Sequence, residues 1–584
     1  MLTCLVLSLG TTRIAAGQSA QAANPLIDAL TAELARAMSS LGKPLAPIPV
    51  AAAAPAAGAA APENPQPPYF ISYAVDDVHA ATITAQYGGL LASESNHVRL
   101  ADVVVRVGDP KLDNTHGERH GSAVQTISLP LGDDRNAIER SLWWATNSDY
   151  ANALQTYQQI KTETEVRAKE EDTSADFSVE RASTNIGSAA PTAVFDRAAW
   201  EGRMKALSAT FRSYPNIDSN FAAFLVQDET SYFVSSEGAR LIHPHIAARV
   251  AIVATTRADD GMDLFRVKTF EAESPDRLPD LDTMQASVRE LGTSLEALRK
   301  APVTEPFSGP AILSGRAAAV FFHEVLGHRL EGQRQRGNEE GQTFTKELGK
   351  PILPSFLSVV DDPTQRTFEN TWLGGSYAYD DEGQRAQRVS LVESGVLKTF
   401  LMSRMPIASV SQSNGHGRSQ TGRMPTGRQG NLIVTSTSTV PEAELRKMLI
   451  AEAKKQGKPY GLYFEDISSG FAVTTRDAPQ AFSVMPLVVY RVYVDGRPDE
   501  LVRGVSIVGT PQTVLSHIVV TSDRREVFNG ECGAESGTIP VSAVAPAMLI
   551  SEIETERKAQ GNARPPILPA PGQSIASAKI VEAR

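Results

Sequence analysis

Hydrophobic and polar residues alternate along much of the chain after residue 68, which is the pattern of strands with one buried face. In the first half of the chain this alternation predicts strands at 69–75, 80–87, 98–107, 222–227, 231–235 and 247–255. Apolar residues at helical spacing predict one helix within 134–171 and another over 281–298. Strands and helices mixed in this way predict an α+β N-terminal domain over residues 69–299.

After residue 300 the strand patterns outnumber the helical ones. Residues 389–392 and 396–402 flank the turn sequence Glu393-Ser394-Gly395 and are predicted to form a hairpin. Another β-forming stretch covers 482–494, where Pro486 indicates a sheet edge or a bulge. Residues 501–508 lead into a short helix and then a strand at 518–520. We therefore predict a second, β-rich and barrel-like domain over residues 300–584.

This second domain begins with an apolar helical segment that contains two polar residues. Between residues 317 and 327 every residue is apolar or glycine except His323 and Glu324, and His328 follows. Buried polar groups need partners, and a metal ion suits two histidines. A spacing of five places the histidines about 140° apart on a regular helix, so we predict a kink or a helix end at Gly327. Alternatively, both are core histidines and Glu324 reaches solvent.

A catalytic zinc site needs a third protein ligand and a general base. Of the two cysteines, Cys4 lies near the start and Cys532 lies in the glycine-rich segment 529–537, which we predict to be a turn that presents the thiol. A lone cysteine is otherwise a small buried hydrophobe. His416 is the rival third ligand. Glu324, which follows the first histidine, is placed to take a proton from a water molecule.

The N-terminal residues have the features of a leader. An apolar run at 5–9 precedes Ala20-Gln21-Ala22, which has the form of a signal-peptidase site, although no basic residue precedes Arg13. Residues 1–22 are therefore a candidate signal peptide, and we expect an exported protein if it is removed and a cytoplasmic one if the start is misassigned. Residues 23–68 are predicted to hold a short amphipathic helix and an Ala/Pro-rich linker.

Charge and hydropathy narrow the choice of partners. The 56 basic and 67 acidic residues give a net charge of -11, which disfavours nucleic-acid binding. No run of about 18 apolar residues exists, so no membrane span is predicted.

Two polar stretches of the second half are candidates for substrate contact. In the glycine-rich loop 414–425, Arg418 or Arg423 is predicted to hold a substrate carboxylate or carbonyl, and His416 to steady an oxyanion. The alternative is a mobile surface loop. The acidic run Asp380-Asp381-Glu382 is predicted to be a solvated turn rather than a second metal site.

Four segments together resemble the TldD/PmbA metalloprotease family, namely 322–332, 359–362, 379–383 and 530–541. The resemblance extends over roughly 311–550. It implies that His323, His328 and Cys532 bind Zn²⁺ and that Glu324 is the catalytic base. It also implies peptide substrates, unfolded or short, and a homodimer or a heterodimer with a metal-free sister subunit.

The predicted function is zinc-dependent hydrolysis of peptide bonds. The alternative is a non-catalytic partner subunit or binding module with a structural zinc, in which Glu324 would have no use.

Overall fold

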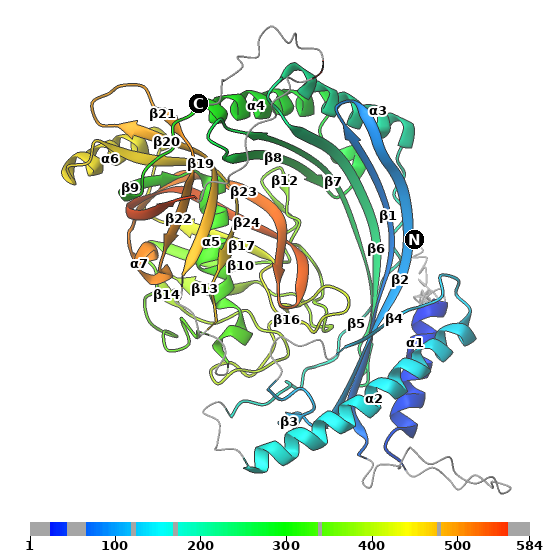
Figure 1. The fold of residues 1–584 in the computed structure, drawn as a ribbon. Coiled ribbons are helices and arrows are strands. Elements are labelled where there is room, and N and C mark those ends of the chain that lie inside the picture. Colours follow the sequence, from blue (N-terminus) through cyan, green and yellow to red (C-terminus); the bar gives the residue numbers. More distant parts are fainter. Residues whose placement is uncertain are drawn as a thin grey trace, which may run out of the picture.

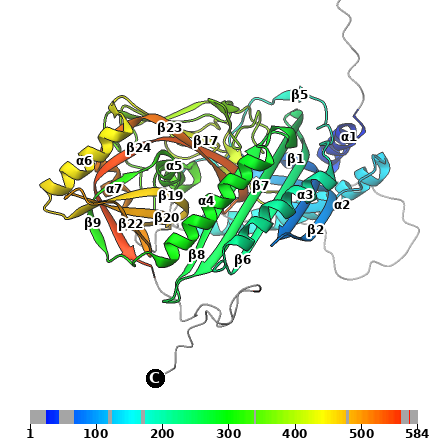
Figure 2. The same ribbon diagram turned by 90° about the horizontal axis from the view of Figure 1, so that it is seen from above.

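The computed structural model describes residues 24–43, 66–117, 124–166, 173–336, 341–475, 481–558 and 571. The candidate signal peptide at 1–22 and most of the predicted linker lie outside these residues. Two large sheets organise the described part (Figures 1 and 2), and the chain passes from the first to the second between Lys300 and Phe307. The α+β class and the β-rich second half are confirmed.

The first sheet is built from long antiparallel strands in the order β2-β1-β6-β7-β8. These are β1 (Pro68–Gln86), β2 (Gly89–Asp109), β6 (Ser219–Ser235), β7 (Arg240–Arg257) and β8 (Asp263–Ala272). The short strands β3 (Leu112–Asp113) and β4 (Gln125–Ser128) pair with β2, and β5 (Thr184–Ile186) pairs with β7. The strands predicted at 69–75 and 80–87 are one continuous strand, and so are those at 222–227 and 231–235. The polar residues between them interrupt the hydrophobic pattern but not the backbone ladder, in which Asp77 pairs with Arg99.

Helices cover only one face of this sheet (Figure 1). Odd-numbered residues of β1, such as Tyr73 and Ile83, pack beneath the helices, whereas even-numbered Ser72 and Asp76 face the other way. The covering elements are α1 (Pro25–Ser40), α2 (Arg135–Val166), α3 (Arg197–Ala209), α4 (Leu281–Lys300) and the 3₁₀ turns η1 (Thr210–Ser213) and η2 (Pro275–Arg277). The short amphipathic helix predicted within residues 23–68 is α1, which packs into the core of the first sheet.

The second sheet closes on itself. Its strand order is β14-β13-β10-β17-β24-β22-β20-β19-β9, and β9 also pairs with β24, which makes a ring of five strands. The predicted barrel-like character is thereby confirmed. The strands are β9 (Phe307–Leu313), β10 (Leu357–Asp361), β13 (Val389–Glu393), β14 (Val396–Leu397), β17 (Asn431–Ser436), β18 (Thr439–Val440), β19 (Tyr460–Ala472), β20 (Phe482–Tyr493), β21 (Glu500–Val502), β22 (Val505–Gly509), β23 (Ile518–Ala534) and β24 (Gly537–Arg557).

Smaller elements complete this half of the molecule. They are the hairpins β11 (Thr367–Phe368) with β12 (Thr371–Trp372) and β15 (Gly417–Arg418) with β16 (Thr426–Gly427), and the helices α6 (Glu442–Lys455) and α7 (Pro511–Ser516). The hairpin predicted around Ser394 and Gly395 is present, with both residues at positive φ. Pro486 lies opposite an irregular stretch of β19, as its bulge interpretation predicts.

One helix, α5 (Gly315–Val325), runs through the middle of the second sheet. Figure 2 looks nearly down its axis and shows strands around it. Its apolar residues, including Val320, Phe321 and Phe322, are buried in the largest hydrophobic cluster. A helix that is apolar on all sides belongs in a core, and this one carries His323 into the core with it. No helix among the described residues meets the length and hydropathy that crossing a bilayer requires.

Candidate metal centre

The helix that carries His323 stops before it reaches His328. Ser314 Oγ accepts a hydrogen bond from Ala317 N–H at 3.1 Å and caps the start of α5. At the other end, the buried Arg329 guanidinium donates to the carbonyls of Glu324 and Val325 at 3.2 and 3.3 Å. The 3₁₀ turn η3 (Gly327–Leu330) then follows, with η4 (Gly332–Gln335) after it. The predicted irregularity is therefore a helix end between the two histidines, which releases His328 from the 140° offset of a regular helix.

Gly327 is needed at this end for a different reason from the one predicted. Its φ is not among the positive values found at other glycines. A Cβ at this position would lie 1.9 Å from Gln429 Oε1, so the glycine allows a close approach of that side chain. Gln429 Nε2 in turn donates to the carbonyl of His323 at 3.3 Å and links the loop before β17 to the end of α5.

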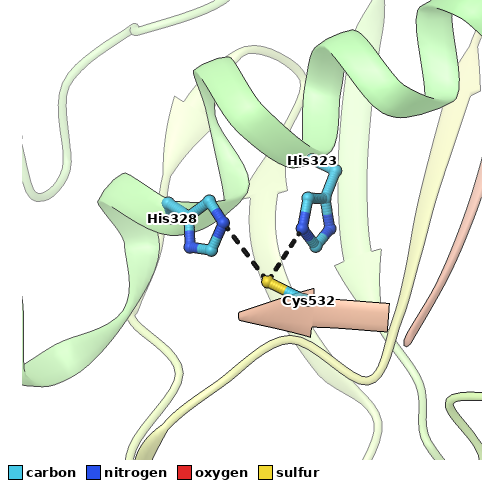
Figure 3. Close-up of side chains that lie close together, drawn as sticks. All are labelled: His323, His328 and Cys532. Carbon is cyan, nitrogen blue, oxygen red and sulfur yellow. Dashed lines mark hydrogen bonds between the residues drawn. The ribbon is translucent and has the colours of Figure 1, made fainter. Parts of the chain in front are cut away.

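Three potential ligand atoms converge beside this helix end (Figure 3). Cys532 Sγ lies 3.2 Å from His323 Nε2 and 3.4 Å from His328 Nε2. The two imidazole rings are nearly perpendicular, at 77°, with centroids 4.9 Å apart. All three side chains are buried, and their ligand atoms lie within 4.8 Å of one another. The structure thus brings together the three residues that the sequence analysis named as metal ligands.

Cys532 reaches this position from a strand rather than from a turn. It lies near the end of β23, pairs with Ile539 of β24, and is buried with Ile539 and Val541. The predicted turn at Cys532 is wrong, because the hairpin reverses further on, at Glu535-Ser536. Burial raises the pKa of the thiol, but the adjacent His328 and His323 outweigh this effect and hold the pKa well below its usual value.

Glu331 orients His328 from the side opposite the thiol. His328 Nδ1 lies 3.1 Å from Glu331 Oε1, which leaves Nε2 facing Cys532. Arg334 Nε donates to Glu331 Oε2 at 2.8 Å. Burial raises the pKa of the Glu331 carboxyl, but the charges of His328 and Arg334 outweigh it and lower this pKa to about 2. The sequence analysis missed this role, although a carboxylate three residues after a ligating histidine on a 3₁₀ turn is a usual orienting partner.

Glu324 lies next to the three residues without joining them. Its Oε2 is 3.9 Å from His328 Nε2, and its side chain is 12% exposed. Strand β19 passes directly over it, because a Cβ on Gly470 would lie 2.8 Å from Glu324 Cγ. Glu324 is therefore a mostly buried carboxylate within reach of a ligand bound between the histidines and Cys532.

The structure does not bring His416 to this centre. Its Nδ1 is 3.1 Å from the carbonyl of Asn414 and its Nε2 is 3.3 Å from Asp361 Oδ1, so both ring nitrogens have partners. Asp361 also accepts hydrogen bonds from the backbone N–H groups of Gly430 and Asn431. His416 thus fixes the loop that leads to Gln429, and among the described residues it does not join the group of potential ligands.

The other predicted substrate residues lie elsewhere. Arg418 and Arg423 line a cavity between the two sheets, and neither His323, His328 nor Cys532 lines that cavity. The solvated turn predicted at 380–382 is wrong. Asp380 is buried and accepts backbone hydrogen bonds from Gly417 and Gln384, and Glu382 accepts one from Arg404 N–H. Burial raises the pKa of Glu382 to about 7.

The donor set fits a zinc ion. Two imidazole nitrogens and one sulfur atom match the ligand types of tetrahedral zinc sites that keep a fourth position open. His323 Nδ1 is buried without a hydrogen-bond partner in the described part of the chain. Soft thiolate with imidazole favours zinc over magnesium or calcium.

A protein-family model matches most of the second half of the chain. Residues 307–557 match the model of the PmbA/TldA metallopeptidase C-terminal domain. This part of the chain is therefore similar to the C-terminal domain of the TldD/PmbA family.

Similar proteins come from several organisms. A protein from Methanothermobacter thermautotrophicus named a metalloprotease is 26% identical over 345 residues, which cover 58% of this chain and 70% of the relative. A metalloprotease TldD homolog from Haemophilus influenzae is 28% identical over 251 residues, which cover 42% of this chain and 47% of the relative. A zinc metalloprotease TldD homolog from Saccharolobus solfataricus is 25% identical over 248 residues, 42% of this chain. The matches thus span about half the length of the latter two relatives, at 47% and 51%.

The fold itself is similar over most of the chain. The crystal structure of TldE from Thermococcus kodakarensis superposes with a TM-score of 0.54 at 12% sequence identity, covering 84% of this chain and 97% of TldE. At this identity the likeness describes the fold of both sheets and not their chemistry.

Proposed function

We propose that this chain is a zinc-dependent peptidase that hydrolyses peptide bonds of unfolded or short peptides. The observation that carries the proposal is the convergence of His323, His328 and Cys532, with the Glu324 carboxylate beside them. These residues come from α5, η3 and β23, so their meeting in a dry core is costly unless they share a partner. The metalloprotease names of the relatives support the same reaction class.

The roles of the side chains follow from their positions. His323, His328 and Cys532 would hold the zinc ion, and Glu331 would keep the His328 ring oriented through Nδ1. When bound, zinc supplies a Lewis acid that lowers the pKa of water and polarises a carbonyl. Glu324 would accept the proton from the attacking water and return it to the leaving amine.

We also propose that the chain acts as a dimer, with a second copy or with a sister subunit. The similar fold of a protein named TldE, beside relatives named TldD homologs, supports this proposal. Sedimentation of the purified chain, alone and with a co-expressed sister subunit, tests it.

A structural zinc in a protein that cleaves nothing is the competing proposal. It explains the three ligands equally well, but it gives no role to Glu324. The carboxylate of Glu324 lies beside the ligands, and Gly470 packs closely against its side chain. The two proposals therefore differ in the role that they give to Glu324.

A Glu324→Gln variant separates them. Zinc content by elemental analysis should equal that of the unmodified chain, whereas hydrolysis of a panel of unfolded proteins and short peptides should fall about 10²- to 10⁴-fold. Glu393→Gln, which changes an exposed carboxylate on the β13–β14 hairpin, is the matched control. If the zinc-loaded chain cleaves none of the panel, or if Glu324→Gln keeps full activity, the peptidase proposal fails.

A further inference from the structure

A large cavity separates the two sheets and lies apart from the metal centre. Its volume is about 1150 Å³. One wall is the helix-free face of the first sheet, and the other is formed by loops of the second half, at 363–386 and 418–425. The β23–β24 hairpin, which carries Cys532, closes part of it with Gly530, Ile539 and Val541. The cavity and the metal centre therefore adjoin the same hairpin.

Arg418 is a cation of this cavity with an unused terminal donor, whereas Arg106 and Arg404, which also line it, each leave only Nε without a partner among the described residues. It is only 8% exposed, and its guanidinium lies over the ring of Tyr377, 4.2 Å from the centroid. Its Nε is 3.5 Å from Asp381 Oδ2, an ion pair longer than a normal hydrogen bond. Its Nη1 is buried and has no hydrogen-bond partner among the described residues. A buried guanidinium donor without a partner is unfavourable, so an acceptor that enters the cavity would be stabilised there.

The wall opposite Arg418 offers a second donor of a different kind. His243 and His245 lie on β7 and line the same cavity, and His243 Nδ1 is buried without a hydrogen-bond partner in the described residues. Burial, and to a smaller extent the charge of Arg418, lowers the pKa of His245 to about 4; burial does the same for His243. Both rings are therefore neutral near pH 7 and can donate one N–H each without repelling Arg418.

The remaining lining selects against a highly charged anion. Asp76, Glu229 and Asp381 also face the cavity, and Ser231 and Thr421 donate hydrogen bonds to Asp76. Burial, and then the charge of Asp76, raise the pKa of the Glu229 carboxyl to about 7. These acidic groups disfavour a phosphate or a nucleic acid, whereas a single carboxylate can pair with Arg418 without meeting all of them.

We propose that this cavity binds a carboxylate group of a short peptide, with Arg418 as its ionic partner and His243 as a second hydrogen-bond donor. The proposal rests on the proposed peptidase function in naming a peptide as the ligand, and it adds a binding site away from the metal centre. The side chains come from both halves of the chain, so the site exists only where the two sheets face each other.

Binding to the full-length Glu324→Gln chain tests this proposal without turnover of the probe. The probes are N-acetyl trialanine as the free acid and as its C-terminal amide, measured by isothermal titration calorimetry at pH 7. The free acid should bind at least about 10-fold more tightly than the amide, because a charge-assisted pair with arginine is lost in the amide. An amide probe with one internal glutamate distinguishes a terminal carboxylate from a side-chain one, and tight binding of either supports the proposal.

Variants assign the preference to residues. Arg418→Gln should abolish the difference between acid and amide, and His243→Leu should reduce it by a smaller factor. Arg388→Gln, an exposed arginine of the same half that does not line the cavity, should leave it unchanged.

Equal affinity of the Glu324→Gln chain for the free acid, its amide and the glutamate-containing amide would overturn the proposal, whether or not the variants fold. A preference that survives in a folded Arg418→Gln chain would overturn it as well. If the unmodified chain cleaves no peptide but the acid preference is present, the peptidase proposal fails and the carboxylate site stands.

Discussion

Polar side chains have different surroundings in the two sheets. In the first sheet, one face packs under helices and the other is polar and lines a cavity. In the second, a closed ring of strands lies around α5, whose buried apolar side chains belong to a large hydrophobic cluster. Polar residues of the first sheet can meet water or a ligand, whereas His323 on α5 is buried and meets Cys532 of β23. The second sheet is therefore where polar side chains are most informative about function.

The largest effect expected from this comparison concerns packing around α5. Phe321 is fully buried, with its ring edge-on to Phe482 at a centroid distance of 5.7 Å. Phe321→Ala should lower the free energy of unfolding of the second half by about 3–5 kcal/mol, because a cavity opens that cannot collapse. Phe221→Ala, on the partly exposed face of the first sheet, should change it by about 0.5 kcal/mol or less. Urea titrations of both variants give the comparison, and similar losses would contradict the contrast between the sheets.

A pH-dependent loss of stability is expected in the first sheet. Asp149 on α2 is buried, and burial raises its pKa from 3.8 to about 7, even though Val105 N–H donates to it. The pKa of Asp149 is higher in the folded chain than in the unfolded chain. The protonated carboxyl therefore contributes fully to the stability of the fold below about pH 4, and this contribution is lost as the pH rises through about 7.

Asp149→Asn should remove this dependence while keeping the acceptor for Val105. Between about pH 4 and pH 8 the unmodified chain should lose up to about 4 kcal/mol of stability relative to the variant. Denaturation midpoints at several pH values measure the difference. Parallel pH profiles for the two proteins would show that Asp149 is ionised in the fold.

A smaller effect is expected beside the metal centre. Glu331→Gln keeps the shape of the side chain but weakens its hold on His328 and Arg334. Zinc affinity in a chelator competition should fall about 10- to 100-fold, as is usual for a carboxylate that orients a ligating histidine. Glu393→Gln serves again as the control. An unchanged zinc affinity in Glu331→Gln would mean that His328 is oriented by packing alone.

The sequence predicts the outline of the second sheet better than its details. Apolar residues around His323 predict a buried helix, and the spacing to His328 predicts its irregular end. What ends the helix could not be predicted. Arg329 donates a hydrogen bond to a carbonyl of the last turn, and Gln429 approaches Gly327 closely, and both contacts exist only in the folded chain. Likewise, glycines around Cys532 resemble a turn, although β24 supplies a partner that makes this segment a strand.

In the first sheet the errors have another cause. Polar residues in mid-strand, such as Asp77, break the hydrophobic alternation on which strand prediction depends. Their side chains find partners across the ladder, as Asp77 does with Arg99 at 2.6 Å, and the backbone pairing continues. For the same reason the sequence predicts a solvated turn at 380–382, since the buried partners of these side chains come from distant segments.

The most direct test of this account is the metal content of the purified chain, measured by elemental analysis beside Cys532→Ala and His328→Ala variants. About one zinc ion per chain is expected, and each variant should lose it, since a site with two protein ligands holds zinc weakly. Zinc retained at full content without Cys532, or no zinc in the unmodified chain after reconstitution, would contradict the central claim that these three side chains form one metal site.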